Sequence, residues 1–186
     1  ISLAAQKDIT LENGESRTSV DQALSIKTKA LIGSKSEKTK EQWNTSESVA
    51  NQLSSAGNII LETKQGNINA THLVAEAGES IQIKSQSGNV ALNSAIDQTS
   101  KSLTSQKKSF ATYNNRQSGY IDQEVAQTQL VAGKNIDINA GKNIELQAND
   151  IQAQDNIYIG NTQFERQVDG SLKSKDGSTM PENVSL

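Results

Sequence analysis

The sequence predicts an all-β chain, specifically a right-handed parallel β-helix with two long β-hairpin-like excursions. Three observations lead to this prediction. A short strand-and-corner motif recurs along the chain, its copies return at regular intervals, and a longer repeat of about 80 residues lies over them.

The short motif is a turn-forming residue, then Ile or Val, a polar residue, and an aliphatic or small residue. Because side chains alternate between the two faces of a strand, this pattern places the apolar pair on one face. In most copies a glycine stands one or two positions earlier, and we expect it to supply the positive φ of a sharp corner. The copies begin at Asp8, Asn58, Asn67, Ser80, Asn89, Asn135, Asn143 and Asn156, and the glycines are Gly57, Gly66, Gly78, Gly88, Gly133 and Gly141.

The spacing of the copies predicts the architecture. The interval from Gly57 to Gly78 is 78 − 57 = 21, and that from Gly66 to Gly88 is 88 − 66 = 22. Strands that return at this interval through corners, rather than through hairpin turns, stack in parallel as coils. We expect Asn side chains stacked at the corners to hydrogen-bond along the axis. The expected interior is Ile59, Leu61, Ile68, Leu73, Ile81, Ile83, Val90, Leu92, Ile136, Ile138, Ile144, Leu146, Ile151, Ile157 and Ile159.

The longer repeat divides the chain into modules. Residues 9–19 resemble 90–100, and residues 57–70 resemble 133–146. We therefore expect a first module at 1–92 and a second at 93–160, followed by a C-terminal cap or linker at 161–186.

Each module contains a polar excursion, at about 12–55 in the first and about 93–129 in the second, before it returns to coils at 56–92 and 130–160. Both excursions are rich in Ser, Thr, Lys and Gln, and in both of them apolar residues flank a polar turn. This pattern predicts two long β-hairpins, and a disordered loop is the alternative interpretation.

Composition narrows the function classes. The net charge is −3, and 18 Lys and Arg residues are scattered among 21 Asp and Glu residues, so no basic stripe indicates nucleic-acid binding. No apolar run is long enough for a membrane span, and the absence of cysteine excludes a disulfide framework. No signal peptide opens the chain, and Ile1 already lies in a strand-like pattern, which suggests a fragment of a longer protein.

The run "AGKNIDINAGKNIELQA" at 132–148, the stretch "THLVAEAGESIQI" at 71–83 and the polar excursions carry a family resemblance. Residues 1–160 resemble the haemagglutinin repeats of filamentous haemagglutinin-like exoproteins, which include large adhesins and contact-dependent growth inhibition effectors. The resemblance implies two-partner secretion through an outer-membrane β-barrel transporter and a β-helical filament on the bacterial cell surface. The implied partners are that transporter, neighbouring repeats of the same chain, and the surface or outer membrane of a target cell.

Candidate site residues are few. His72 is the only histidine, and with no cysteine it predicts neither a zinc site nor a catalytic triad. Asp137, Asp150 and Asp155 stand where a strand surface or corner already favours a polar residue, so we expect no catalytic, metal or cofactor site. Trp43, Tyr113 and Tyr120 lie in the excursions and are candidate partner contacts, with packing inside the fold as the alternative.

Two functions follow as hypotheses. The first is a structural and interaction segment of a secreted surface filament, serving adhesion or delivery of a C-terminal toxin to neighbouring bacteria. The second is a β-helical polysaccharide-processing enzyme, which would require carboxylates that converge on one cleft.

Overall fold

The structure, a computed structural model, describes residues 1–29, 33–177 and 184–185. These residues form twenty β-strands in four sheets and contain no helix, so the prediction of an all-β chain is confirmed. The described residues accordingly provide no helix that is long and apolar enough to cross a membrane.

The chain divides into two compact units. The first contains residues 1–14, 48–95 and 125–186, and the second contains residues 15–47 and 96–124, which come from the two excursions. The module boundaries expected near residues 92 and 160 follow the sequence repeat instead of these units, and they stay a prediction.

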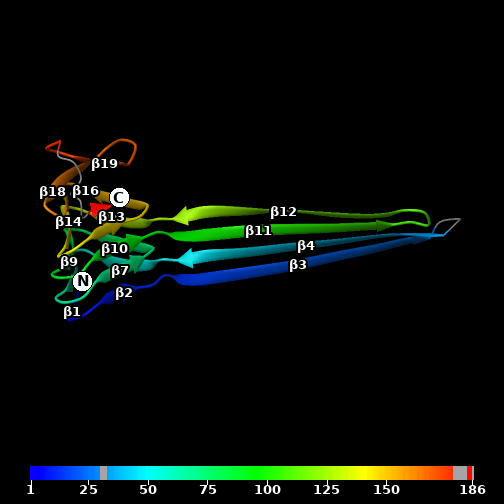
Figure 1. The fold of residues 1–186 in the computed structure, drawn as a ribbon, viewed down its shortest axis with the longest axis horizontal. Helices are drawn as coiled ribbons and strands as arrows, with labels where there is room; N and C mark the ends of the chain where they lie inside the picture. The colour runs from blue at the N-terminus through cyan, green and yellow to red at the C-terminus, as the bar shows by residue number, and fades with distance from the viewer. Residues whose placement is uncertain (30–32, 178–183, 186) are drawn as a thin grey trace. The chain divides into compact units, whose positions relative to one another are not determined.

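Three sheets of the first unit are built mainly from parallel strands (Figure 1). The seven-stranded sheet contains, in spatial order, β1 (Ser2–Ala5), β6 (Ile59–Thr63), β9 (Ile81–Ser85), β14 (Asn135–Ala140), β17 (Asn156–Ile159), β18 (Thr162–Arg166) and β19 (Leu172–Ser174). The five-stranded sheet contains β2 (Ile9–Leu11), β7 (Ile68–Thr71), β10 (Val90–Asn93), β15 (Ile144–Leu146) and β20 (Val184–Ser185). The parallel four-stranded sheet contains β16 (Asn149–Ala153), β13 (Thr128–Ala132), β8 (Leu73–Ala77) and β5 (Asn51–Ser55).

The chain visits these three sheets in a fixed order, and we call each passage a round. Round 2 consists of β6, β7 and β8, and round 4 consists of β14, β15 and β16. Strand β6 pairs in parallel with β9, and β14 pairs in parallel with β17.

Hydrogen bonds between equivalent corners show the length of a round. The backbone N–H of Ser80 donates to Asn58 Oδ1, which lies 22 residues earlier in the chain. Asn156 Nδ2 donates to Asn135 Oδ1, which lies 21 residues earlier. The parallel pairing and the interval that the repeat predicts are therefore both present.

A short link joins the five-stranded sheet to the parallel four-stranded sheet in rounds 2 and 4: His72 alone in round 2, and residues 147–148 in round 4. His72 and Ala148 each have a φ of 50°. A positive φ is uncommon outside glycine, because Cβ then approaches the following carbonyl oxygen. These two corners therefore turn sharply without a glycine.

Round 1 (β1, β2 and β5) and round 3 (β9, β10 and β13) carry their excursions at this same corner. In round 3, Asn93 pairs with Thr71 and Gln129 pairs with Val74, so residues 94–127 stand where round 2 has His72 alone. Pairing of Asn51 with Leu73 places residues 13–50 at the same point of round 1.

The spacing across the second excursion agrees with this assignment. The backbone N–H of Asn135 donates to Ser80 Oγ, which lies 55 residues earlier in the chain. If one corner residue stood in place of 94–127, that interval would fall to 22 residues, the same as between Asn58 and Ser80. The excursion is therefore an insertion that leaves the length of its round unchanged.

The core is formed by side chains from the three sheets of the first unit, and all fifteen residues predicted for the interior are buried. Period-two alternation is visible directly in β6 and β9, where buried side chains alternate with more exposed ones. The sequence prediction missed small and late members of the core: Ala70, Ala75, Ala77, Leu130, Ala132 and Phe164.

The role expected for the corner glycines was wrong. None of the six has a positive φ, which is found instead at Gly33, Gly160, Gly170 and Gly177. A Cβ added at Gly133 would lie 2.2 Å from the carbonyl oxygen of Gly78, and one added at Gly78 would lie 2.2 Å from that of Ala56. These two glycines are needed because the backbones of stacked corners approach too closely for any side chain.

The predicted stacking of Asn side chains at the corners is confirmed. The backbone N–H of Asn89 donates to Asn67 Oδ1 at 2.8 Å, and that of Asn143 donates to Asn89 Oδ1 at 3.1 Å. Asp8 Oδ1 accepts from the backbone N–H of Asn67 at 2.6 Å and extends this ladder to round 1. The ladder satisfies backbone donors that the strand pairing leaves unused at the corners.

The second unit is one sheet, the hairpin sheet, in which β3 (Gly14–Lys29), β4 (Ser34–Val49), β11 (Ala95–Lys108) and β12 (Tyr113–Ala126) lie side by side (Figure 1). The described residues of both excursions thus form long paired strands, as one of the two interpretations predicted. The hairpins pair with each other through antiparallel β4 and β11, where Lys101 faces Trp43 and Lys108 faces Ser36.

After β17 the chain leaves the parallel pattern. Strands β18 and β19 add to the seven-stranded sheet as an antiparallel meander. Phe164 of β18 is buried in the core, and Leu172 of β19 packs against it. Residues 162–174 therefore cover apolar side chains of the last round.

We predict that Ile144→Asp destabilises the chain by about 4 kcal/mol or more, because Ile144 is 1% exposed and a buried, unpaired carboxylate is costly. Glu145→Asp is the matched control, since the neighbouring side chain of the same strand is exposed. Urea unfolding followed by circular dichroism measures both. Equal midpoints would contradict the inward orientation of Ile144.

We predict that Gly133→Ala costs about 1–3 kcal/mol, the usual range for overpacking, because its Cβ would meet the backbone of the adjacent corner. Gly57→Ala is the control, because an added Cβ there meets nothing within 4 Å. Thermal melts of the two variants decide the question. A Gly133→Ala protein as stable as Gly57→Ala would show that the corners are not in close contact.

Candidate partner-binding surface on the hairpin sheet

The hairpin sheet is largely exposed and rich in polar residues. Ser, Thr, Lys and Gln occupy many positions of its four strands, and β3 is exposed along its whole length. The three aromatic residues singled out in the sequence are all exposed: Trp43 by 43%, Tyr113 by 64% and Tyr120 by 54%. Packing inside the fold therefore does not explain them, and they are available as contacts.

Trp43 and Tyr120 share one face of the sheet, which we call the aromatic face. Lys101 faces Trp43 in the strand register, and its Nζ lies 4.4 Å from the centroid of the indole ring. The bond from Ser109 N to Thr112 O and the contact between Gln123 and Gln98 set a register in which Tyr120 lies opposite Lys101.

Lys101 is held on the aromatic face by two interactions. Its Nζ lies 2.5 Å from Glu41 Oε1, in addition to its cation–π contact with Trp43. The hydrogen bond from Lys101, and to a smaller degree that from the Trp43 side chain, holds the pKa of Glu41 below its usual value. An exposed cation–π pair contributes about 0.5–1 kcal/mol, enough to orient the indole ring.

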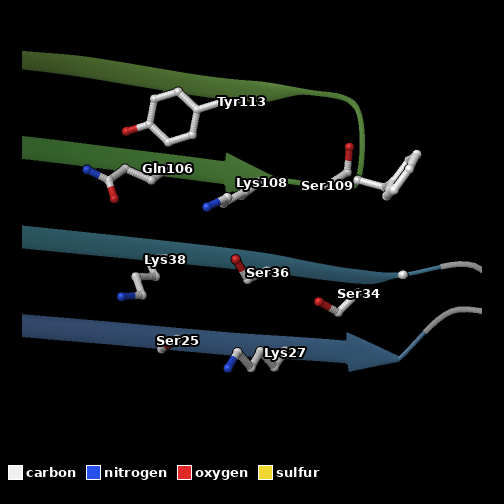
Figure 2. A pocket seen from close by; sticks show the side chains of 11 residues that line it. Ser25, Lys27, Ser34, Ser36, Lys38, Gln106, Lys108, Ser109 and Tyr113 are labelled. Atoms are coloured by element: carbon white, nitrogen blue, oxygen red, sulfur yellow. The ribbon is translucent and has the colours of Figure 1, made fainter.

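Tyr113 lies on the opposite face, beside a hollow of about 690 Å³ near the hairpin turns (Figure 2). We call this the tip hollow. Gly33 is part of its rim, with a φ of 84°, and a Cβ there would lie 3.3 Å from Phe110 Cβ. The side chains around the hollow are hydroxylic, amide, basic or aromatic: Ser25, Lys27, Ser34, Ser36, Lys38, Gln106, Lys108, Ser109, Phe110 and Tyr113.

The lysines of the hairpin sheet sort between its faces. Lys107 lies 2.9 Å from Glu37, and Lys101 pairs with Glu41, all on the aromatic face. The lysines lining the tip hollow, Lys27, Lys38 and Lys108, are exposed, and no described carboxylate lies within ion-pair distance of them.

The expectation that the basic residues are scattered holds along the sequence and fails in space. Within "SKSEKTKEQ" (34–42), alternation sends Lys35, Glu37 and Glu41 to one face and Lys38 and Lys40 to the other. The sequence thus contains the separation of these lysines from the glutamates, but the separation can be recognised only once the segment is known to be a strand. We call the side that carries Lys38 and Lys40 the basic face.

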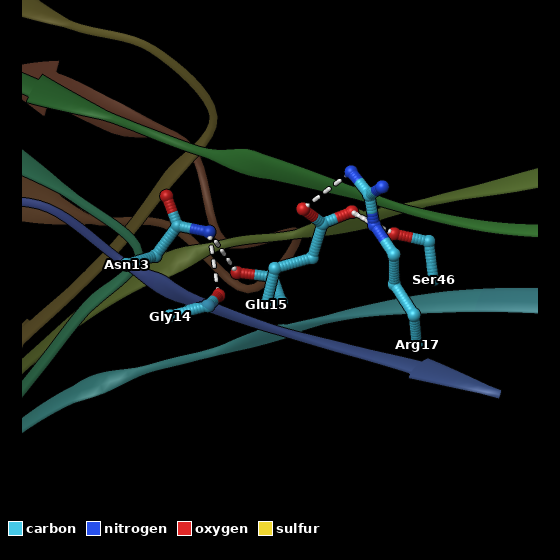
Figure 3. A network of polar contacts seen from close by, with 6 residues as sticks. Asn13, Gly14, Glu15, Arg17 and Ser46 are labelled. Atoms are coloured by element: carbon cyan, nitrogen blue, oxygen red, sulfur yellow. Dashed lines mark hydrogen bonds and ion pairs between the residues drawn. The ribbon is translucent and has the colours of Figure 1, made fainter.

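A polar network lies at the start of the hairpin sheet (Figure 3). The Arg17 guanidinium donates to both carboxylate oxygens of Glu15 at 2.8 Å, and Ser46 Oγ also donates to Glu15. These bonds, led by that from Arg17, hold the pKa of Glu15 below its usual value. Arg17 of β3 and Ser46 of β4 both bind the Glu15 carboxylate, so this network fixes the first residues of β3 against β4.

The contacts of His72 indicate a structural role for this residue. Its Nδ1 lies 2.7 Å from Ser48 Oγ, and Asn13 Nδ2 donates to the same oxygen at 2.9 Å. A nucleophilic triad requires a carboxylate that orients the imidazole. Among the described residues, the hydrogen-bond partner of the His72 ring is Ser48, not a carboxylate. The contact instead joins the His72 corner to the two ends of the first excursion.

The three candidate aspartates do not converge. Asp137 lies on β14 of the seven-stranded sheet, Asp150 lies on β16 of the parallel four-stranded sheet, and Asp155 follows β16 at a corner. Arg166 donates to Asp150 at 2.7 Å, which engages that carboxylate. Among the described residues, no group of three metal-ligating side chains comes together.

Asp137 is a carboxylate at a hollow of the first unit. The hollow has a volume of about 310 Å³ and is lined by Asn58, Ile60, Ser80, Ile81, Gln82, Asn135 and Asp137. Burial raises the pKa of Asp137, and the nearby Lys84 opposes that shift. Asp137 is the only carboxylate among the described residues that line this hollow. A glycosidase needs two carboxyl groups, an acid and a base or nucleophile, and this hollow does not bring two together.

Comparisons with known proteins cover both the sequence and the structure of the chain. No protein-family model, no curated protein and no solved structure matches the chain.

We predict that Asp137→Asn stabilises the chain at neutral pH. The raised pKa means that ionised Asp137 is disfavoured in the folded state, so its destabilising effect is complete above the folded pKa. The effect disappears below the unfolded value, near 3.8, where both states are protonated. Thermal melts of both proteins between pH 3 and 7 test this. A variant that loses stability at pH 7 would contradict the assignment.

Proposed function

We propose that this chain is a structural and interaction segment of a large secreted surface filament. Its first unit serves as the rigid stalk, a right-handed parallel β-helix, and its hairpin sheet serves as the partner-binding element. In this role it supports adhesion, or delivery of a C-terminal toxin to neighbouring bacteria in contact-dependent growth inhibition.

The observation that carries the proposal is the position of the insertions. Both hairpins leave their rounds at the same corner, and the rounds keep an interval of 22 residues with or without the second hairpin. An insertion that the scaffold does not need for its own core, and that exposes aromatic and basic side chains, is typical of a binding element on a rigid framework.

The sequence resemblance supports the rest of the proposal. Repeats of this kind occur in filamentous haemagglutinin-like exoproteins, so we propose export by an outer-membrane two-partner-secretion transporter and display at the cell surface. The proposed external partner is the surface or outer membrane of a target cell. Neighbouring β-helical repeats of the parent protein are its internal partners.

The alternative, a polysaccharide-processing enzyme, has one observation in its favour: the raised pKa of Asp137 in a surface hollow. Hydrolysis that Asp137→Asn abolishes, in a screen of pectins, glycosaminoglycans and bacterial exopolysaccharides, would promote this alternative. We predict that the purified chain cleaves none of them.

We predict that replacing residues 94–127 with a single histidine preserves the folded rounds. The replacement reproduces the Thr71–His72–Leu73 corner of round 2, because Asn93 is the register partner of Thr71. The variant should show a cooperative melt and a β-type circular dichroism spectrum, while attachment of the labelled chain to Gram-negative cells should fall at least tenfold.

The double variant Trp43→Ala/Tyr120→Ala keeps both hairpins, so it tests separately whether the aromatic face takes part in attachment. Unchanged attachment by the one-residue-corner variant would refute the hairpin sheet as the binding element. Loss of the cooperative melt would instead show that the hairpin belongs to the core.

A further inference from the structure

The basic face of the hairpin sheet concentrates positive charge near the tip hollow. Lys27, Lys38 and Lys108 line the hollow, and Lys29 and Lys40 follow on the same face by alternation along β3 and β4. All five are exposed. On this face no acidic residue occurs among the described residues of 25–29, 33–40 or 104–117.

The arrangement is not required by the fold. Lys101 and Lys107 of the aromatic face pair with Glu41 and Glu37, at 2.5 and 2.9 Å, whereas the lysines of the basic face have no described carboxylate within ion-pair distance. Neighbouring strands lie about 4.8 Å apart, so like charges on adjacent strands repel each other. An anionic ligand that bridges the strands would relieve that repulsion.

Two exposed aromatic side chains stand beside these lysines. Phe110 is 83% exposed and Tyr113 is 64% exposed, and both border the tip hollow. Figure 2 shows Tyr113 there. A soluble polyanion without apolar or aromatic groups, such as heparin, has nothing to place against the exposed ring of Phe110. A lipid surface can accommodate this ring, because aromatic rings partition to the boundary between headgroups and acyl chains while lysines contact the phosphates.

We propose that the basic face binds phosphate groups of an anionic lipid surface, with Phe110 and Tyr113 entering the headgroup region. The lysines provide the electrostatic attraction, and Ser25, Ser34 and Ser36 provide hydroxyl donors beside them. This inference rests on the proposed function and specifies the chemistry of the partner at the hairpin sheet.

Vesicle co-sedimentation of the complete 186-residue chain tests the proposal. Vesicles of phosphatidylcholine with phosphatidylglycerol should bind the chain, and vesicles of phosphatidylcholine alone should not. Lys27→Gln/Lys38→Gln/Lys108→Gln should weaken binding about a hundredfold, at roughly fivefold per lysine near an anionic surface.

Lys35→Gln/Lys107→Gln/Arg116→Gln is the matched control, since Arg116 shares the face of Tyr120 by alternation along β12. It removes the same charge from the other face of the same sheet, and its binding should change by less than about fivefold. Equal loss in the two triple variants would overturn the proposal, because net charge alone would then explain binding. Circular dichroism verifies that both variants keep their strands.

A reporter variant distinguishes lipid from other phosphate-bearing or anionic ligands. Trp43 is the only tryptophan, so Trp43→Phe/Phe110→Trp places the sole indole at the tip. Its emission should shift to the blue with phosphatidylglycerol vesicles and stay unchanged with inorganic phosphate or heparin. An unshifted emission on bound vesicles, or full displacement by inorganic phosphate or heparin, would overturn the lipid assignment.

The cell-attachment measurement separates this inference from the proposed function. If the chain ignores anionic vesicles but loses attachment when residues 94–127 are replaced, the hairpin sheet binds another partner and only the lipid inference fails. If it binds vesicles without attaching to cells, the proposed adhesive function fails instead.

Discussion

The close contact between stacked corner backbones is the constraint on which the other features depend. Gly78 and Gly133 allow it because a Cβ at either position would lie 2.2 Å from a carbonyl oxygen of the adjacent round. Once the corners touch, strands of successive rounds fall into parallel register, and Ile59, Ile81 and Ile136 stack at the same level of the core. Polar ladders such as Asn67–Asn89–Asn143 then satisfy the corner donors.

The same register explains where function can be added. A corner made by His72 or Ala148 can be exchanged for a hairpin of more than thirty residues without changing the length of the round. Two rounds add two strands to each parallel sheet, and one hairpin adds two strands to the hairpin sheet.

The sequence predicted what local alternation controls. All fifteen aliphatic residues assigned to the interior are buried, because period two fixes their face once the strands stack. It did not predict the reason for Gly133, since a glycine needed for close approach looks the same in sequence as one needed for positive φ. The sequence identified Trp43, Tyr113 and Tyr120 as candidate contacts without assigning them a face, and the strand register places Tyr113 on the face opposite the other two. The pairing of β4 with β11 joins segments more than fifty residues apart, and no local pattern encodes it.

The central claim is that rounds stack in register across an inserted hairpin, and its most direct test is a distance. Gln82 and Asp137 are partners on β9 and β14, although the second excursion separates them in sequence. The chain has no cysteine, so nitroxide labels can be attached to Gln82→Cys/Asp137→Cys alone. Continuous-wave electron paramagnetic resonance should show strong dipolar broadening that is absent from either single-label protein. Spectra equal to the sum of the single-label spectra would contradict the stacked account.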